Sequence, residues 1–210
     1  MLKKILCGTF RMRYEFLTST EHALFDAAFD LHELSFPPTL RRSRESFARA
    51  FSDPDFECIA FRESQAVMGY ATRWFLPDAV YLESIVVAPE FRGLGLGRQH
   101  LREIVATSRK PVAALVADEL PGALAFFLKS GFHLNDTDAV VPPCLPGAGK
   151  RRFALVTSPR LWDEKERATA LQEIARKICP GNQAQESALS SPDADAARPL
   201  ARAPIRRPVP

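Results

Sequence analysis

Short apolar runs, rich in aromatic and β-branched residues, recur along the first three quarters of the chain and predict strands. The first is Arg13–Leu17. Residues Phe56–Phe61 and Ala66–Phe75 flank the polar segment Arg62–Gln65, which favours a hairpin. Val80–Val87 is apolar at most positions, so we expect it to be a central strand buried on both faces. Further strands are predicted at Val112–Ala117, Phe132–Leu134 and Arg151–Val156.

Apolar residues at helical spacing predict helices between these strands. The segment Thr18–Glu21 offers an N-terminal cap for the first helix, which continues through Ala28 and Leu31. Pro37 and Pro38 must end this helix, because proline lacks the amide donor. The remaining helices are predicted at Ser43–Phe51, Arg98–Arg109, Ala123–Ser130 and Leu161–Cys179.

This order of elements favours one mixed α/β domain (α+β) whose sheet is mainly antiparallel and flanked by helices. We place the domain at residues 12–157, a C-terminal amphipathic helix at 158–179 and a disordered Ala/Pro/Arg-rich tail at 180–210. Asp136–Gly149, with three prolines and two glycines, predicts a long loop inside the domain.

Composition narrows the function classes. The formal charge is only +3 over 210 residues, so no nucleic-acid partner is expected. The four cysteines are far apart, which favours neither a metal site nor a disulfide framework, and we expect a reduced, cytoplasmic setting. No segment approaches the roughly 18 apolar residues that span a bilayer, so no membrane partner is expected.

The chemically informative segment follows the central strand. That strand runs into the glycine-rich turn Arg92–Gly97, which opens a helix, so backbone amides and the positive end of a helix dipole converge there. Glycines let the main chain approach a phosphate, and Arg92 and Arg98 add positive charge. The turn therefore predicts an anion site; the alternative is that it only joins a strand to a helix.

Spacing excludes two familiar phosphate motifs. A P-loop needs Lys-Ser or Lys-Thr after its last glycine, but Gly97 is followed by Arg98 and Gln99. A dinucleotide fingerprint that begins at Gly93 or Gly95 lacks its third glycine.

The pattern Arg92-x-x-Gly95-x-Gly97, after a strand that ends Val-x-Pro, resembles the acetyl-CoA motif of the Gcn5-related N-acetyltransferase (GNAT) superfamily. Gly69-Tyr70 is similar to the usual Gly-Tyr of the preceding strand, and Ala123–Phe132 is similar to the family's helix-to-strand segment. The resemblance covers roughly Met12–Val156.

This resemblance implies the acyl-CoA N-acyltransferase fold, in which the neighbouring parallel strands Val80–Val87 and Val112–Ala117 splay into a V-shaped slot. It implies acetyl-CoA as the acyl donor and requires no metal. The pantetheine arm would lie along the backbone of Ile85 and Val87, and Arg92–Gly97 would hold the pyrophosphate. The full expected cofactor set is Ile85, Val86, Val87, Arg92, Gly93, Leu94, Gly95, Leu96, Gly97, Arg98 and Phe127.

Glu83 is the candidate general base. Residues 81, 83, 85 and 87 share one face of the strand, which we expect to line the slot. The alternative is a structural ion pair between Glu83 and an arginine such as Arg73 on the neighbouring strand, and both interpretations stay open.

The sequence departs from the family at the usual proton donor. Phe127 occupies the position where the family carries a tyrosine, and it has no proton to give. Tyr70, Tyr81 or water would then protonate the thiolate, or the thiolate leaves unassisted, or catalysis is weak. Leu115 stands where protein N-terminal acetyltransferases often carry a glutamate, which argues against that subclass.

Arg41, Arg42 and Arg44 follow Phe36-Pro37-Pro38 in the region where this fold usually builds its acceptor wall. They can hold an acidic acceptor or form a solvated face, and we favour the solvated face. The four histidines share no spacing and are expected at the surface or in packing.

The sequence thus predicts an N-acetyltransferase that moves an acetyl group to a primary amine of a small-molecule or peptide acceptor. The chain is expected to be a monomer or a homodimer. The alternatives are a CoA-binding sensor without turnover and an interaction module that works through its helix at Leu161–Cys179.

Overall fold

The computed structural model describes residues 13–64, 66–120, 122–141 and 151–178. The expected tail at 180–210 and the end of the predicted loop at 142–149 lie outside these residues. The strands are β1 Arg13–Leu17, β2 Phe56–Glu63, β3 Ala66–Phe75, β4 Val80–Val87, β5 Val112–Val116, β6 His133–Val141 and β7 Arg151–Ser158. The helices are α1 Phe25–Ser35, α2 Arg44–Ala50, the short 3-10 helix η2 Pro89–Phe91, α3 Leu96–Thr107, α4 Ala123–Lys129 and α5 Glu164–Ile178.

The strands form one seven-stranded sheet in the order β1-β2-β3-β4-β5-β7-β6. Every neighbouring pair is antiparallel except β4 and β5, which are parallel. The predicted fold class, a mixed and mainly antiparallel sheet flanked by helices, is confirmed.

The parallel pair is short. Only Val80 with Val112 and Tyr81 with Ala113 are in register, although β4 continues to Val87. Beyond Tyr81, no described strand pairs with β4 on the β5 side, so the two strands separate toward their carboxyl ends.

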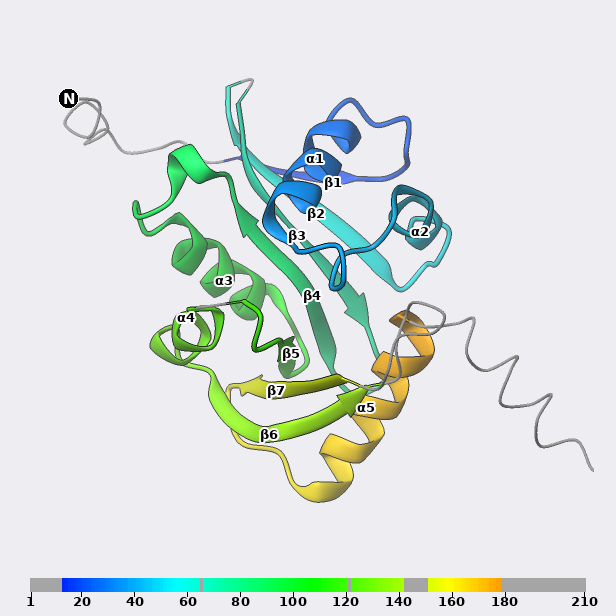
Figure 1. Ribbon diagram of the computed structural model, residues 1–210, viewed down its shortest axis with the longest axis vertical. Coiled ribbons are helices and arrows are strands. Elements are labelled where there is room, and N and C mark those ends of the chain that lie inside the picture. Colours follow the sequence, from blue (N-terminus) through cyan, green and yellow to red (C-terminus); the bar gives the residue numbers. More distant parts are fainter. Residues whose placement is uncertain (1–12, 65, 121, 142–150, 179–210) are drawn as a thin grey trace, which may run out of the picture.

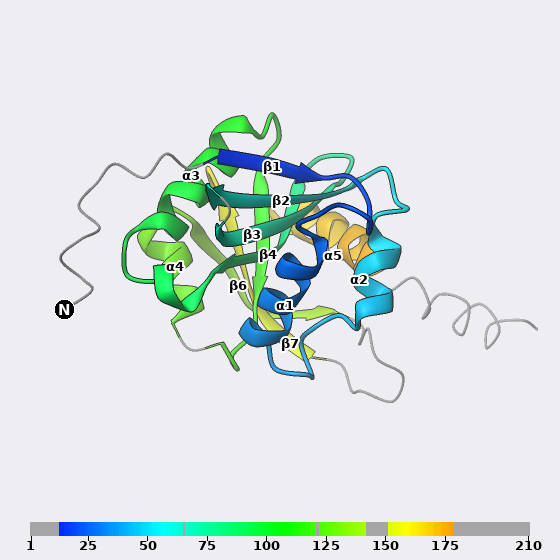
Figure 2. The ribbon, with the colours of Figure 1, turned by 90° about the horizontal axis from the view of Figure 1, so that it is seen from above.

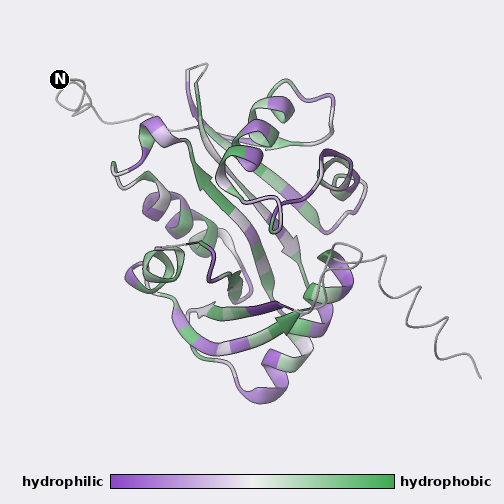
Figure 3. Cartoon of the chain, in the orientation of Figure 1, coloured by the Kyte–Doolittle hydropathy of each residue, from purple (hydrophilic) through white to green (hydrophobic). Residues whose placement is uncertain are grey.

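Helices cover both faces of the sheet. Figures 1 and 2 show α3 and α4 on one face and α1, α2 and α5 on the other. In Figure 3 the central strands are mostly green, whereas α3 and α5 carry both green and purple, as expected for helices with one buried side. The core therefore lies in two layers, one on each side of β4.

Strand β4 contains an irregularity at Glu83. Thr72 of β3 pairs with Ser84 and Arg73 pairs with Leu82, so Glu83 is the extra residue of a β-bulge. The bulge changes which side chains share a face.

The prediction that residues 81, 83, 85 and 87 share one face is therefore wrong. Ile85 packs with the cluster beneath α3 and α4, whereas Tyr81 packs with the cluster beneath α5, and Val87 packs with Leu96 of α3. Glu83 and its neighbour Ser84 instead line the same cavity on the α1 and α2 side.

Two other expectations were wrong at element ends. Helix α1 begins at Phe25 and has no side-chain cap, so Thr18–Glu21 is not its cap. The predicted loop at Asp136–Gly149 begins later, because β6 continues to Val141 through irregular pairing with β7. Within the described residues, no helix has the length and apolar character needed to cross a membrane.

Candidate active site and cofactor cradle

The glycine-rich turn joins β4 to α3 through η2. Gly93 and Gly95 have φ values of +79° and +80°, which residues with a Cβ rarely adopt, while no atom lies within 4 Å of a Cβ built on either. Conformation, rather than crowding, therefore requires glycine at these two positions. A Cβ at Gly97 would lie 3.3 Å from Val87 Cγ2, so this glycine lets α3 begin close to the end of β4.

The turn presents unpaired donors at the start of a helix. Within the described chain, the amides of residues 93–98 have no backbone acceptor. Arg92 is held beside them, because its Nε donates to the Val87 carbonyl at 2.9 Å. Arg98 is exposed and Leu96 is buried, which anchors the turn. This arrangement of amides, helix dipole and guanidinium suits a phosphate group.

The pairing of β3 with β4 also orients backbone groups toward the opening beside β5. The Ala88 amide donates to the Met68 carbonyl at 2.8 Å, so this pair is hydrogen-bonded. Because hydrogen-bonded and non-hydrogen-bonded pairs alternate, Val87 with Gly69 and Ile85 with Ala71 are non-hydrogen-bonded pairs. The N–H and C=O groups of Ile85 and the N–H group of Val87 therefore point away from β3, where an extended ligand can pair with them, whereas the Val87 carbonyl accepts from Arg92 Nε.

A cavity of about 300 Å³ lies on the face of the sheet that α1 and α2 cover. Its floor is formed by Tyr81, Glu83 and Ser84 of β4 and by Leu115 and Ala117 at the end of β5. The loop between α1 and α2 and the C-terminal end of α5 form its walls. The cavity thus reaches the two strands that separate.

Both carboxylate oxygens of Glu83 accept hydrogen bonds at this cavity. Its Oε1 accepts from Arg42 Nε at 2.7 Å, and its Oε2 accepts from Trp74 Nε1 at 2.8 Å. The side chains of Glu83 and Arg42 are 14% and 13% exposed, so the ion pair is shielded from water but open to the cavity. Arg42 Nη1 donates further to Ser46 Oγ at 3.0 Å, which ties the pair to α2.

The structure corrects two expectations about this ion pair. Glu83 does pair with an arginine, but with Arg42 rather than Arg73, whose Nε donates to Glu57 at 2.5 Å. Arg42 does not belong to a solvated face, whereas Arg41 and Arg44 do form partly exposed surface pairs with Glu33 and Asp26.

The two candidate tyrosines are buried. Tyr70 lies 0% exposed, with its hydroxyl 2.7 Å from His32 Nδ1, and burial raises its pKa well above the usual range. Tyr81 lines the cavity, and burial likewise raises its pKa. Of the two, Tyr81 is the one that the structure places at the cavity.

His32 connects Tyr70 to the loop that carries Arg42. Its Nε2 accepts from the Arg42 amide at 3.0 Å, and burial lowers its pKa to about 4, so the ring is neutral near pH 7. A neutral ring that accepts at Nε2 donates from Nδ1, here to the Tyr70 hydroxyl. His32 thereby fixes the backbone of Arg42.

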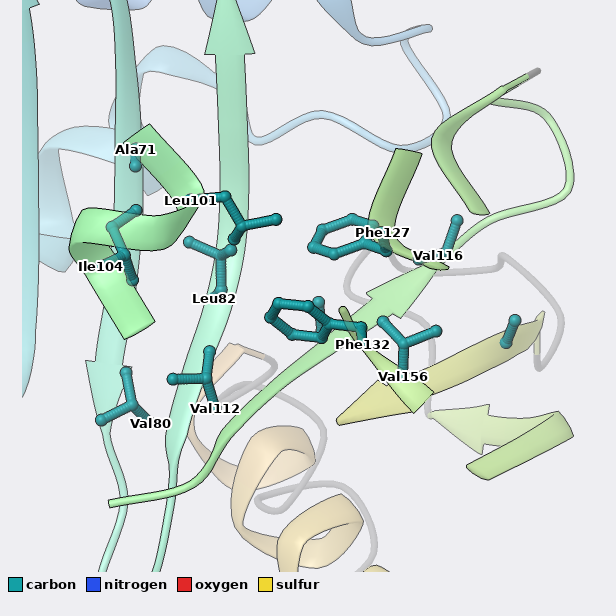
Figure 4. Packing of buried hydrophobic residues seen from close by; sticks show 12 residues of the cluster. Ala71, Val80, Leu82, Leu101, Ile104, Val112, Val116, Phe127, Phe132 and Val156 are labelled. Atoms are coloured by element: carbon teal, nitrogen blue, oxygen red, sulfur yellow. The ribbon is translucent and has the colours of Figure 1, made fainter. Parts of the chain in front are cut away.

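Phe127 belongs to the core beneath α4. Figure 4 shows its ring directed toward Leu101 of α3 and close to Val116 of β5, within the cluster that also contains Phe132. It offers an apolar surface beside the separating strands and has no proton to donate.

Sequence reasoning missed Arg42, Trp74 and His32 as parts of the site. Arg42 stood in a recognised arginine run, but its contact with Glu83 spans 41 positions and depends on the course of the loop after α1. Among the described residues, no group of His, Cys, Asp and Glu side chains could hold a metal ion.

Three features together define the acyl-CoA acyltransferase fold class. They are a mainly antiparallel sheet with two diverging parallel strands, an anion-binding glycine turn at the end of one of these strands, and a cavity at their opening. The chain belongs to the acetyltransferase (GNAT) family, because the sequence model of that family matches residues 22–132. Members of the family are acyl-CoA-dependent N-acyltransferases, so the resemblance read from the glycine turn is confirmed. No curated protein sequence matches the chain.

Solved structures share the fold. An acetyltransferase of the GNAT family from Bacteroides thetaiotaomicron has a TM-score of 0.71 at 20% identity, covering 80% of this chain and 98% of that one. A Bacillus subtilis acetyltransferase in complex with CoA has a TM-score of 0.52 at 18% identity, covering 72% and 100%. The ribosomal-protein-S18-alanine N-acetyltransferase of Escherichia coli has a TM-score of 0.53 at 18% identity, covering 73% and 97%.

Proposed function

We propose that this protein transfers the acetyl group of acetyl-CoA to a primary amine by direct attack. The observation that carries the proposal is the position of the β4 and β5 opening. The outward N–H and C=O groups of Ile85, the outward N–H of Val87 and the glycine turn lie along β4. A separate cavity reaches the same two strands from the α1 and α2 side. Donor and acceptor can therefore enter from different sides and meet at the strands.

The donor would bind through the backbone. The amides at 93–98 and the Arg92 and Arg98 guanidiniums would hold the pyrophosphate. The outward groups of Ile85 and the outward N–H of Val87 would pair with the pantetheine arm. An outward amide near Val87 is also the group positioned to stabilise charge on the thioester oxygen during attack.

Glu83 would act on the acceptor. Each of its carboxylate oxygens accepts one hydrogen bond, from Arg42 or from Trp74, and retains a second acceptor site, so the carboxylate can take an ammonium proton directly or through water. Tyr81 lines the same cavity as Glu83 and is the proposed donor to the departing thiolate. Phe127 would contribute only apolar contact with the cofactor.

Calorimetric titration with acetyl-CoA and with CoA tests donor binding. Gly95→Glu places a carboxylate in the proposed phosphate cradle and should weaken binding at least tenfold, about 1.4 kcal/mol. Gly131→Glu is the matched control, because Gly131 also has a positive φ, +91°, and open surroundings but follows α4. Equal effects of the two variants would remove the cradle assignment.

Thiol release over a library of primary amines tests the transfer. Amine-dependent release by the protein, lost together with donor binding in Gly95→Glu, supports the acetyltransferase. Tight CoA binding without release for any amine supports the alternative, a CoA-binding sensor, to which the missing tyrosine at Phe127 points.

A further inference from the structure

Four arginines and two glutamates line the acceptor cavity. Arg41 comes from the loop after α1, Arg42 from the same loop, Arg49 from α2 and Arg151 from the start of β7. Because Arg42 already neutralises Glu83, three arginines remain against Glu45. His32 adds no charge, since its pKa of about 4 leaves it neutral.

These three guanidiniums retain free donors. Arg49 has no ion-pair partner among the described residues. Arg151 contacts Glu119 through a single nitrogen at 3.2 Å, and Arg41 contacts Glu33 at 3.2 Å, both as partly exposed pairs of low strength. Each guanidinium has five N–H groups, so a ligand carboxylate can bind without displacing these partners.

The rest of the cavity is largely apolar. Side chains from five separate parts of the chain supply this surface, namely Phe36, Leu40, Leu115, Leu120, Val141, Phe153 and Ile178. The volume of about 300 Å³ is at the low end for small-molecule pockets, which favours a compact ligand. The cavity thus combines a cationic set, an apolar surface and the Glu83 carboxylate.

The cationic set also favours the reaction. Positive charge near an ammonium group lowers its pKa, because it disfavours the protonated form. An amine in this cavity is therefore more readily neutral, the state that attacks a thioester.

We propose that the acceptor is a small amine that also carries a carboxylate, of the kind of an α-amino acid with an apolar side chain. Its amine would lie at Glu83, its carboxylate at Arg49 and Arg151, and its side chain on the apolar wall. This inference rests on the proposed acetyl transfer and names the substrate class of the same cavity.

The test compares matched acceptor pairs by thiol release in the full chain. Leucine is paired with 3-methylbutylamine and phenylalanine with phenethylamine, which differ only by the carboxylate. The amino acids should have kcat/KM values at least tenfold higher. Arg49→Gln and Arg151→Gln should each raise KM for the amino acids about fivefold to tenfold, with little change for the plain amines or in kcat.

Arg44→Gln is the control variant, because Arg44 pairs with Asp26 outside the cavity and should leave all four acceptors unchanged. Equal or faster acetylation of the plain amines overturns this inference and leaves the transferase intact. Preference for a peptide over the free amino acid overturns the small-acceptor assignment. CoA binding with no release for any amine overturns the proposed function itself, and this inference with it.

Discussion

At the scale of single residues, buried polar groups without partners are the notable feature of this protein. His100 is 1% exposed, and its ring centroid lies 5.2 Å from that of Tyr14 and 4.0 Å from that of Phe61. Neither ring nitrogen has a hydrogen-bond partner among the described residues. Burial lowers its pKa to about 3, with the Arg73 charge acting in the same direction. A buried histidine without hydrogen bonds lowers the free energy of unfolding, and the lowered pKa makes this effect depend on pH.

We predict that His100→Leu stabilises the fold. The folded imidazole has a lowered pKa, so below about pH 6.5 the unfolded chain binds a proton that the folded chain does not, and stability is lost as the pH falls toward 3. Leucine removes both the unpaired nitrogens and this proton. Urea unfolding should show a gain of about 1–2 kcal/mol at pH 7.5 and a larger gain at pH 5. A gain that does not grow at pH 5 would contradict the assigned pKa direction.

The residues of the glycine turn were open to prediction, whereas those around Glu83 were not. The positive φ values of Gly93 and Gly95 follow from a local pattern within six positions. Arg42 reaches Glu83 from 41 positions away, and Trp74 reaches it from the neighbouring strand β3. Nothing in the sequence around either residue indicates its contact with Glu83. A single sequence therefore predicts a site that is built from neighbouring residues. It does not predict a contact among the loop after α1, β3 and β4.

At the scale of elements, the bulge in β4 determines how one strand serves two sites. Before the bulge, Leu82 packs beneath α3 and Tyr81 faces α5; after it, Ile85 packs beneath α3 and Val86 packs with the cluster under α1. The extra residue directs Glu83 and Ser84 together into the cavity. The Glu83 carboxylate in this position can act as a general base or serve only in a structural ion pair.

We predict that Glu83→Gln separates these two roles. As a general base, Glu83 should contribute about 10²–10⁴-fold, so kcat should fall by at least a hundredfold while acetyl-CoA affinity in calorimetry stays the same. Glu57→Gln is the control, because it breaks a similar ion pair, with Arg73, outside the cavity. Loss of stability with retained kcat would make Glu83 a structural partner of Arg42.

Element positions were predicted well where burial follows a regular period. The limits of β1, β3 and β4 agree with the predicted ones. The bulge was not predicted, because inserting one residue changes the period without changing the apolar character of β4. The extent of β6 was also missed, since within its polar stretch Asn135–Asp138 only Asp136 is in register with β7, between two irregularities.

At the scale of the whole molecule, α5 is packed into the domain. Ile174 is 0% exposed, and with Trp162 and Ala170 it belongs to the cluster that contains Trp74 and Tyr81. Lys177 Nζ lies 2.8 Å from both Asp53 and Asp55, which joins the C-terminal end of α5 to the loop before β2. We therefore propose that α5 is a structural part of the catalytic domain.

We predict that truncation after Ser158 destabilises the domain, whereas truncation after Ile178 does not. Removing α5 exposes several large apolar side chains, each contributing roughly 1.5–3 kcal/mol when buried. The shorter chain should lose about 10 °C or more in Tm by calorimetry, and acetyl-CoA binding and turnover together. A stable shorter chain that binds acetyl-CoA without turnover would instead support an interaction module in the C-terminal helix.

Part of the cavity wall comes from residues beyond those that the family model matches. Val141, Arg151, Phe153 and Ile178 all follow residue 132, where the family match ends, whereas the glycine turn lies inside it. Changes in the last third of the chain can therefore redirect acceptor choice while the donor half stays the same. Evolution of this protein's selectivity can proceed by remodelling one end of the gene, with no loss of acetyl-CoA use along the way.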